Sequence, residues 1–108
     1  MSNEEHRARE REHEIRKSLQ MLHDETHSAL SSQKAFINND LHEMRLYWKD
    51  DEEISKALMQ LEKDSDEWCK AVSSQSRKHE EHLMAELQHL KKETQKAVKE
   101  KKGGNNDN

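Results

Sequence analysis

Apolar residues recur along this chain at steps of three and four, the spacing of one face of an α-helix. In the first half the stripe passes through Ile15, Leu19, Leu22, Thr26, Leu30, Gln33, Ile37, Leu41, Met44 and Trp48. In the second half it passes through Ile54, Leu58, Leu61, Ser65, Trp68, Val72, Ser76, His79, Leu83, Leu87, Leu90, Thr94 and Val98. Repeated 3-4-4 steps lie close to the natural period of a straight helix. The pattern therefore predicts two long amphipathic helices.

The two stripes are out of phase across an acidic segment. Trp48 and Ile54 lie six positions apart, whereas three or four positions would continue one helix face. Asp50 and Glu53 have the Asp-x-x-Glu spacing of a helix start, which is related to the capping box. We therefore expect one helix over about 4–48, a turn at about 49–51 and a second helix over about 52–101. The alternative is one unbroken helix, because the chain has no proline and its two glycines stand at 103 and 104.

A turn at this place brings the two stripes together layer by layer. Leu41 then faces Leu61, and Leu19 faces Leu83. The predicted fold class is all-α, an elongated, coiled-coil-like antiparallel two-helix hairpin over residues 1–102, followed by a disordered polar tail over 103–108. The sequence Asn38-Asn39-Asp40 is a weaker candidate for a break, because short polar side chains compete for backbone hydrogen bonds.

The composition indicates that the hairpin is incomplete by itself. Hydrophobic residues make up 30% of the 108 residues and charged residues 39%, against about 25% charged in ordinary domains. Two helices enclose only one side of an apolar stripe, so we expect a homo-oligomer or a helical protein partner to complete a bundle. The expected interface lies near the turn and comprises Leu41, Met44, Leu46, Tyr47, Trp48, Ile54, Leu58, Met59, Leu61 and Trp68.

Candidate chemistry is confined to histidine. His23 and His27 share one helix face and His79 and His82 another, so these four residues are weak candidates for a zinc site. Because His79 alone belongs to the stripe, we expect neither a metal nor another cofactor.

Catalytic signatures are sparse. Cys69 lies beside Trp68 without sequence that would build a pocket, and no glycine-rich phosphate loop is present. We therefore expect no enzyme.

The charge pattern bears on the partners and the location. The net charge is −4, and no aromatic residue interrupts the lysines of residues 91–102, so nucleic-acid binding is not expected. No apolar run approaches the roughly 20 residues of a membrane span. The single cysteine cannot form an internal disulfide, which fits a reducing, cytoplasmic location.

These patterns together predict a non-enzymatic helical protein–protein interaction subunit, an adaptor or scaffold component. The alternatives are a long parallel coiled-coil spacer and a His-rich metal-binding helical bundle. In outline, Trp48 at the expected turn resembles the WxG family of small secreted helical hairpins. Lys49-Asp50 lacks the glycine of that motif, so the resemblance carries no function to this chain.

Overall fold

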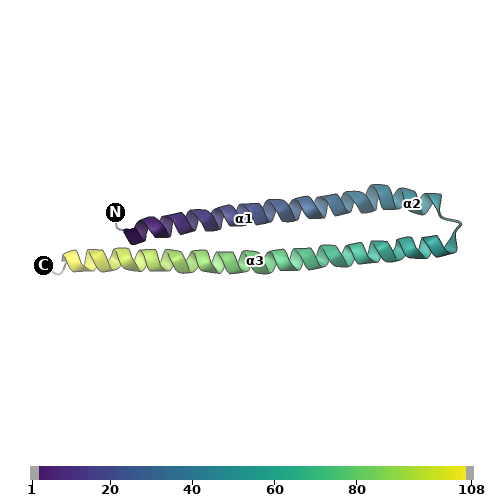
Figure 1. Ribbon diagram of the computed structural model, residues 1–108. Coiled ribbons are helices and arrows are strands. Elements are labelled where there is room, and N and C mark those ends of the chain that lie inside the picture. The colour runs from purple at the N-terminus through teal and green to yellow at the C-terminus, as the bar shows by residue number, and fades with distance from the viewer. Residues whose placement is uncertain (1–2, 107–108) are drawn as a thin grey trace. The chain divides into compact units, whose positions relative to one another are not determined.

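The computed structural model describes residues 3–106, and the side chains of residues 3–96. Helix α1 spans Asn3–Ala35, the π-helix η1 spans Phe36–Leu41, α2 spans His42–Tyr47 and α3 spans Glu52–Asn106 (Figure 1). No strand occurs between residues 3 and 106. The predicted all-α class is confirmed.

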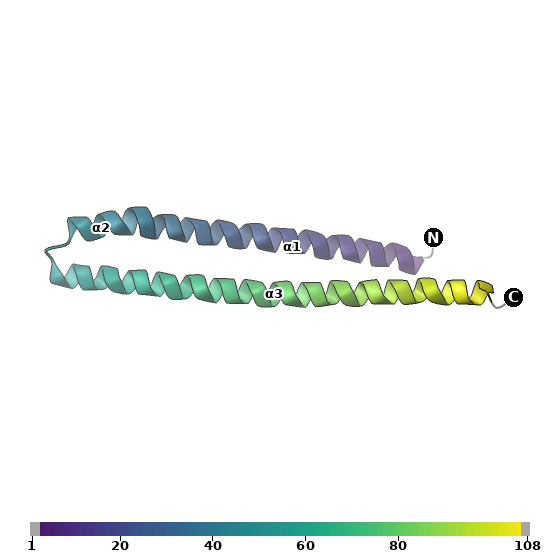
Figure 2. The same ribbon diagram turned by 180° about the vertical axis from the view of Figure 1, so that it is seen from behind.

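Two compact units make up the chain. The turn-end unit is His23–Arg77, and the open-end unit combines the residues up to Leu22 with those from Lys78 onward. The turn-end unit is a helical hairpin whose two arms run antiparallel on either side of the turn (Figures 1 and 2). In the open-end unit the first part of α1 and the later part of α3 also pack antiparallel. The predicted antiparallel two-helix hairpin is therefore confirmed.

The turn occupies residues 48–51, where the sequence predicts 49–51. The Trp48 N–H donates to the Met44 carbonyl at 2.9 Å, and the Asp51 N–H donates to the Trp48 carbonyl at 3.0 Å. No described residue has a positive φ. The chain therefore reverses here without needing the left-handed conformation that favours glycine.

Helix α3 begins with a side-chain cap from Asp51. Its Oδ1 accepts a hydrogen bond from the Ile54 N–H at 3.0 Å, which satisfies one of the free N–H groups of the first turn. The cap is therefore Asp51, one residue after the Asp50 that the spacing suggests, while α3 begins at Glu52 as predicted. The Ser55 hydroxyl also donates to the Trp48 carbonyl at 3.0 Å, so the turn is tied to α3 from both of its ends.

Loss of this cap should weaken the hairpin measurably. We expect Asp51→Ala to lower the free energy of unfolding by about 1 kcal/mol, the usual cost of removing an N-cap side chain. Asp50→Ala is the matched control, because it removes the same charge one residue away. Urea unfolding followed by circular dichroism measures both variants, and equal losses would contradict the assignment of the cap to Asp51.

The expected irregularity at Asn38-Asn39-Asp40 is present as the π-helix η1. A π-turn takes one residue more than an α-turn and so shifts the phase of the helix. The three polar residues are exposed, Phe36 is half-buried, and Leu41 is only 1% exposed. The π-helix therefore places a polar segment on the outside of the hairpin and Leu41 on its buried face.

The C-terminal end differs from the expectation. Helix α3 continues through Gly103 and Gly104 to Asn106, where the sequence predicts a disordered tail. Neither glycine has the positive φ of a left-handed helix cap. Glycine costs about 1 kcal/mol in a helix relative to alanine, and this cost does not forbid a helix. Residues 107 and 108 lie outside the described residues.

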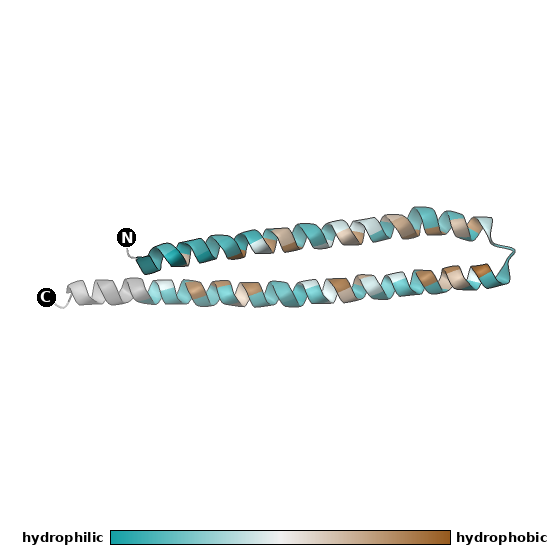
Figure 3. Cartoon of the chain, in the orientation of Figure 1, coloured by the Kyte–Doolittle hydropathy of each residue, from teal (hydrophilic) through white to brown (hydrophobic). Residues whose placement is uncertain are grey.

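Each unit has its own small core along the predicted stripes. In the open-end unit Ile15, Leu83 and Leu87 are buried together, and Leu19, Leu22 and Leu90 pack against them. In the turn-end unit Leu41, Leu58 and Ser65 are buried. Apolar positions alternate with hydrophilic ones along α1 and α3 (Figure 3).

Two polar pairs cross between the arms of the turn-end unit. The hydroxyls of Thr26 and Ser76 are hydrogen-bonded at 2.8 Å, and the amide of Gln33 donates to the Ser65 hydroxyl. Among the described side chains, every buried polar atom has a hydrogen-bond partner. The polar middle of the stripe is therefore satisfied within the hairpin.

Candidate functional site

Large apolar side chains remain exposed mainly in the turn-end unit. Among the described residues, the exposed set outside this unit consists of Met21 and Met84. Inside it, the exposed set comprises Met44, Leu46, Tyr47, Trp48, Met59, Leu61 and Trp68. All seven belong to the interface that the sequence predicts. A concentration of exposed large apolar side chains in one part of a protein is typical of an interaction site.

The three other members of the predicted interface are buried or half-buried. Leu41 and Leu58 are buried and belong to the core, so they are not available to a partner, and Ile54 is half-buried. The predicted surface is therefore smaller than the sequence suggests.

On α3, fewer residues of the predicted stripe are buried against the opposing helix than the sequence suggests. Leu61 is 42% exposed and Trp68 45% exposed, while the residues after them, Glu62 and Cys69, are half-buried. His79, which also belongs to the predicted stripe, is exposed as well. A single opposing helix covers only part of a wide apolar stripe, and the remainder faces outward.

An ion pair distinguishes the two sides of the turn-end hairpin. Arg45 of α2 donates to Glu62 of α3. Met44 and Leu61 each precede a member of this pair by one residue, which is a rotation of about 100° on a helix. In an antiparallel pair of right-handed helices, this backward step rotates both side chains toward the same side. Met44 and Leu61 therefore share the side opposite the ion pair.

This side, hereafter the apolar side, is mostly uncharged, and its charges have one sign. At helical spacing around Leu61, α3 presents Ala57, Leu61, Asp64, Trp68, Ala71 and Gln75, and the other arm presents Phe36, Asp40, Met44 and Tyr47. Within these two rows Asp40 and Asp64 are the charged residues, and both are exposed. The Asp64 Oδ1 accepts a hydrogen bond from the neutral amide of Gln60 at 2.9 Å.

The sequence prediction of the interface does not include the polar and small residues of these rows. The alanines, Gln75 and Asp64 all stand at three-and-four spacing from Leu61 or from each other, which is a usable signal. Asp40 gives a weaker signal, because the π-helix changes the spacing of the arm that carries it.

Two aromatic rings stand at the turn itself. Tyr47 and Trp48 meet edge to face, with ring centroids 5.0 Å apart and planes at 77°. Tyr47 is 79% exposed, the largest exposed fraction among the large apolar residues described. Together with residues 50–53 they line a shallow, acidic hollow. The pair forms an exposed aromatic contact point at the end of the hairpin.

The opposite side of the hairpin carries charges of both signs. A second shallow hollow lies there, lined by Leu30, Lys34, Asp66, Cys69, Lys70, Ser73, Ser74 and Arg77. Cys69 is a free, half-buried cysteine. The two sides of the turn-end unit thus differ in charge, since the apolar side is acidic and the opposite side is mixed.

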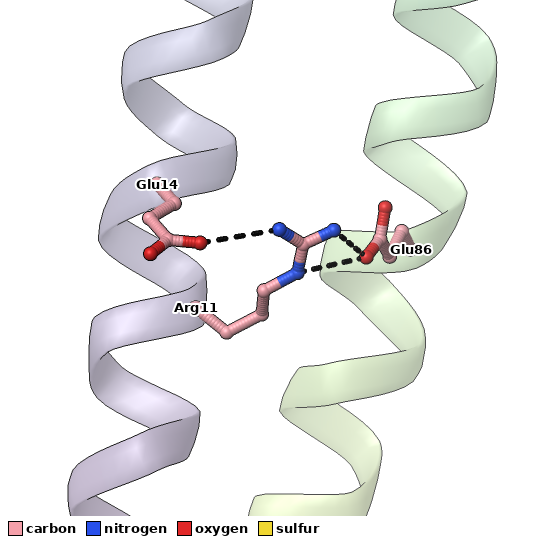
Figure 4. A network of polar contacts seen from close by, with 3 residues as sticks. All are labelled: Arg11, Glu14 and Glu86. Atoms are coloured by element: carbon pink, nitrogen blue, oxygen red, sulfur yellow. Dashed lines mark hydrogen bonds and ion pairs between the residues drawn. The ribbon is translucent and has the colours of Figure 1, made fainter.

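In the open-end unit a charged network joins α1 to α3. The Arg11 Nε donates to Glu86 Oε1 at 3.0 Å, and its Nη1 donates to Glu14 at 3.2 Å (Figure 4). Hydrogen bonding to Glu86 and then to Glu14 raises the pKa of Arg11 above its ordinary value. All of these side chains reach solvent, so the network stabilises helix pairing and offers no enclosed site.

The histidine candidates do not form a ligand cluster. The rings of His23 and His27 stack with centroids 6.4 Å apart. No group of three or more His, Cys, Asp or Glu residues in the described part of the chain is placed to hold a metal ion. Within residues 3–106, no helix combines the length and apolarity needed to cross a membrane.

Comparisons with protein-family models, curated proteins and solved structures found no match to this chain. Its functional interpretation therefore rests on its own surface.

Proposed function

We propose that this protein is a non-enzymatic helical interaction subunit, an adaptor or scaffold component, that binds protein through the turn-end unit. One observation carries the proposal: exposed large apolar side chains concentrate in this unit, and Met44, Tyr47, Leu61 and Trp68 share its apolar side. The proposal concerns binding through a surface, because the described hollows are shallow and open.

The energetics favour coverage of this surface. Burying a large apolar side chain gains roughly 1.5–3 kcal/mol, and Met44, Leu61 and Trp68 all retain much of their exposure. Tyr47 and Trp48 add two aromatic side chains of the kind that dominate binding energy at protein interfaces. A partner that covers these residues gains this stabilisation without any rearrangement of the hairpin.

The alternative functions have weaker support. A long parallel spacer uses a continuous helix, whereas this chain reverses at residues 48–51. A metal-binding bundle needs ligands that converge on one point, and the His23 and His27 rings instead stack against each other.

Site-specific crosslinking tests the proposal. A photoreactive phenylalanine analogue replaces Tyr47 in the full chain, inside cells that normally make the protein. We expect covalent adducts with another polypeptide, either a second copy or a different protein, because Tyr47 belongs to the exposed cluster. The same probe at Lys63, which is exposed outside the apolar side, is the control. Absence of polypeptide adducts at Tyr47, or equal adducts at both positions, would contradict the proposal.

A further inference from the structure

We propose that the apolar side of the turn-end unit binds an amphipathic helix of a different protein, and that this helix carries basic side chains between its apolar ones. This inference rests on the proposed function and names the chemistry of its partner. A second copy of the chain is the alternative occupant of the same surface.

Two acidic residues stand within the apolar side at a similar level of the hairpin. Asp40 and Asp64 are both exposed. Each lies, on its own arm, between the Gln33–Ser65 hydrogen bond and the ion pair that joins α2 to α3. Because both contacts join the two arms, the two aspartates occupy the same stretch of the hairpin. A partner helix that crosses this stretch meets both carboxylates.

Apolar residues flank the two aspartates along the hairpin. Met44 and Leu61 lie on the side nearer the turn, and Phe36 and Trp68 lie on the side farther from it. On α3, Leu61 and Trp68 are seven residues apart, which is two helical turns, and Asp64 lies between them. The apolar side therefore presents an apolar, an acidic and a second apolar layer in succession.

No basic side chain neutralises these carboxylates within the described part of the chain. Asp40 takes part in no ion pair or side-chain hydrogen bond there, and Asp64 is bonded to the neutral amide of Gln60. A purely apolar partner would remove water from both carboxylates without replacing its hydrogen bonds, which is costly. A lysine or arginine at the matching position of the partner forms a charge-assisted hydrogen bond instead.

The acidic character of this region continues to the turn. The hollow beside Tyr47 and Trp48 is also lined by Asp50, Asp51, Glu52 and Glu53. A helix that lies along the apolar side and reaches the turn meets acidic groups at both places. Complementary charge of this kind favours a basic partner and suppresses acidic ones.

The shape of the surface suits a single additional helix. Both arms contribute to the apolar side, so it is a layer of two antiparallel helices on which a third can lie. An amphipathic helix typically enters such a site with anchors at spacings of three, four and seven residues. The small side chains of Ala57 and Ala71 allow its backbone to approach α3 closely.

A second copy of the chain fits this surface less well. The two rows of the apolar side contain no basic residue. Docking two such sides face to face would bring four carboxylates, Asp40 and Asp64 of each copy, into one interface. Like charges that meet across an interface cost binding energy, so the surface favours a partner of opposite charge.

Titration with two designed peptides tests the inference. Both peptides are 21-residue amphipathic helices with the same leucine stripe, and neither contains tryptophan. The residues that flank the stripe are lysine in one peptide and glutamate in the other. In a Trp48→Phe form of the full chain, Trp68 is the one remaining tryptophan and reports binding by its fluorescence. We expect a shift to shorter wavelength, with a dissociation constant at least tenfold lower for the lysine peptide.

Matched variants locate the bound peptide on the apolar side. Asp40→Asn/Asp64→Asn should weaken binding of the lysine peptide by about fivefold at low salt, because it removes both carboxylates of the acidic layer. Asp66→Asn removes an exposed acidic charge that lines the hollow on the opposite side, and it should change the affinity by less than about twofold. Circular dichroism of each variant establishes that the helices persist.

A second pair of variants tests the apolar layer. Leu61→Ala should weaken binding by about fivefold or more, as for an interface anchor. Met59→Ala truncates a residue that is 58% exposed and lies about 200° away around α3, so it should leave the affinity nearly unchanged.

The outcomes separate this inference from the proposed function. Equal affinity for the two peptides, or equal effects of the two charge variants, would overturn the basic helix as the partner. A dimer that is detected by sedimentation equilibrium and lost in Leu61→Ala would also overturn it and would identify a second copy as the occupant. In either case, adducts from Tyr47 would leave the proposed function standing, whereas their absence would overturn both proposals.

Discussion

Leu41→Ala is expected to lower the free energy of unfolding by about 2–5 kcal/mol, the cost of a cavity at a buried leucine. Leu41 is the last residue of the π-helix and is 1% exposed. Domains of this size are stable by only about 5–15 kcal/mol, so the variant should be substantially destabilised at room temperature. Urea unfolding at low protein concentration, followed by circular dichroism, measures the effect.

Leu46→Ala is the matched control for this change. It truncates the same kind of side chain five residues later, where the leucine is 59% exposed. We expect a loss below about 1 kcal/mol, as for most surface substitutions. If the two variants lost similar stability, the burial assigned to Leu41 by the hairpin would be wrong.

Ser65→Ala is expected to cost about 1–3 kcal/mol, because it leaves the Gln33 amide without the hydroxyl that accepts its hydrogen bond. Ser65 is buried and Gln33 is half-buried, so water replaces this partner poorly. The double variant Gln33→Leu/Ser65→Ala removes both polar groups and should recover most of the loss. A double-mutant cycle from urea unfolding gives the coupling between the two positions.

The exposed Ser31 supplies the control for the serine substitution. Ser31→Ala removes a hydroxyl at an exposed position and should change stability by less than about 0.5 kcal/mol. If the stability losses of Gln33→Leu and Ser65→Ala simply added in the double variant, the Gln33–Ser65 hydrogen bond would have no measurable role.

Much of the fold follows from the spacing of apolar residues. The phase break between Trp48 and Ile54 locates the reversal, because no single helix face connects the two stripes. Ile15, Leu83 and Leu87 lie on the predicted stripes and are buried as a cluster. The stripes and the break between them are local in sequence, so periodicity alone is enough to find them.

The details that sequence does not predict depend on the opposing helix of the hairpin. Leu61 and Trp68 satisfy the apolar period as well as Leu58 does, yet they are exposed while Leu58 is buried. Periodicity defines a stripe, whereas the exact direction of approach of the opposing helix decides which half of the stripe is covered. The cap at Asp51 was missed for a related reason: Asp50 and Asp51 are chemically identical, and only the backbone path selects one of them.

The interaction surface was predicted as a group of residues, and the structure divides that group. Sequence places Leu41, Leu58 and Leu61 together near the turn, because all three are apolar and lie on the stripes. The hairpin buries the first two and leaves the third on its apolar side. The approach of the two arms also brings Asp40 and Asp64 to one side, and no pattern within either arm predicts that. A candidate interface can therefore be located from composition, but its faces require the arrangement of both arms.

The π-helix has a consequence for how the chain tolerates changes of length. Each residue of an α-helix advances the rotation by about 100°. The π-turn already holds one residue more than an α-turn, so deleting one residue among 38–40 would let the segment close as ordinary α-helix and keep Leu30 and Gln33 near their present phase. Inserting one more residue would instead rotate the preceding arm of the turn-end unit by that angle. The side chains of Asn38 and Asn39 are exposed, so their removal takes no apolar group from the core. Single deletions in this segment should therefore be tolerated better than single insertions.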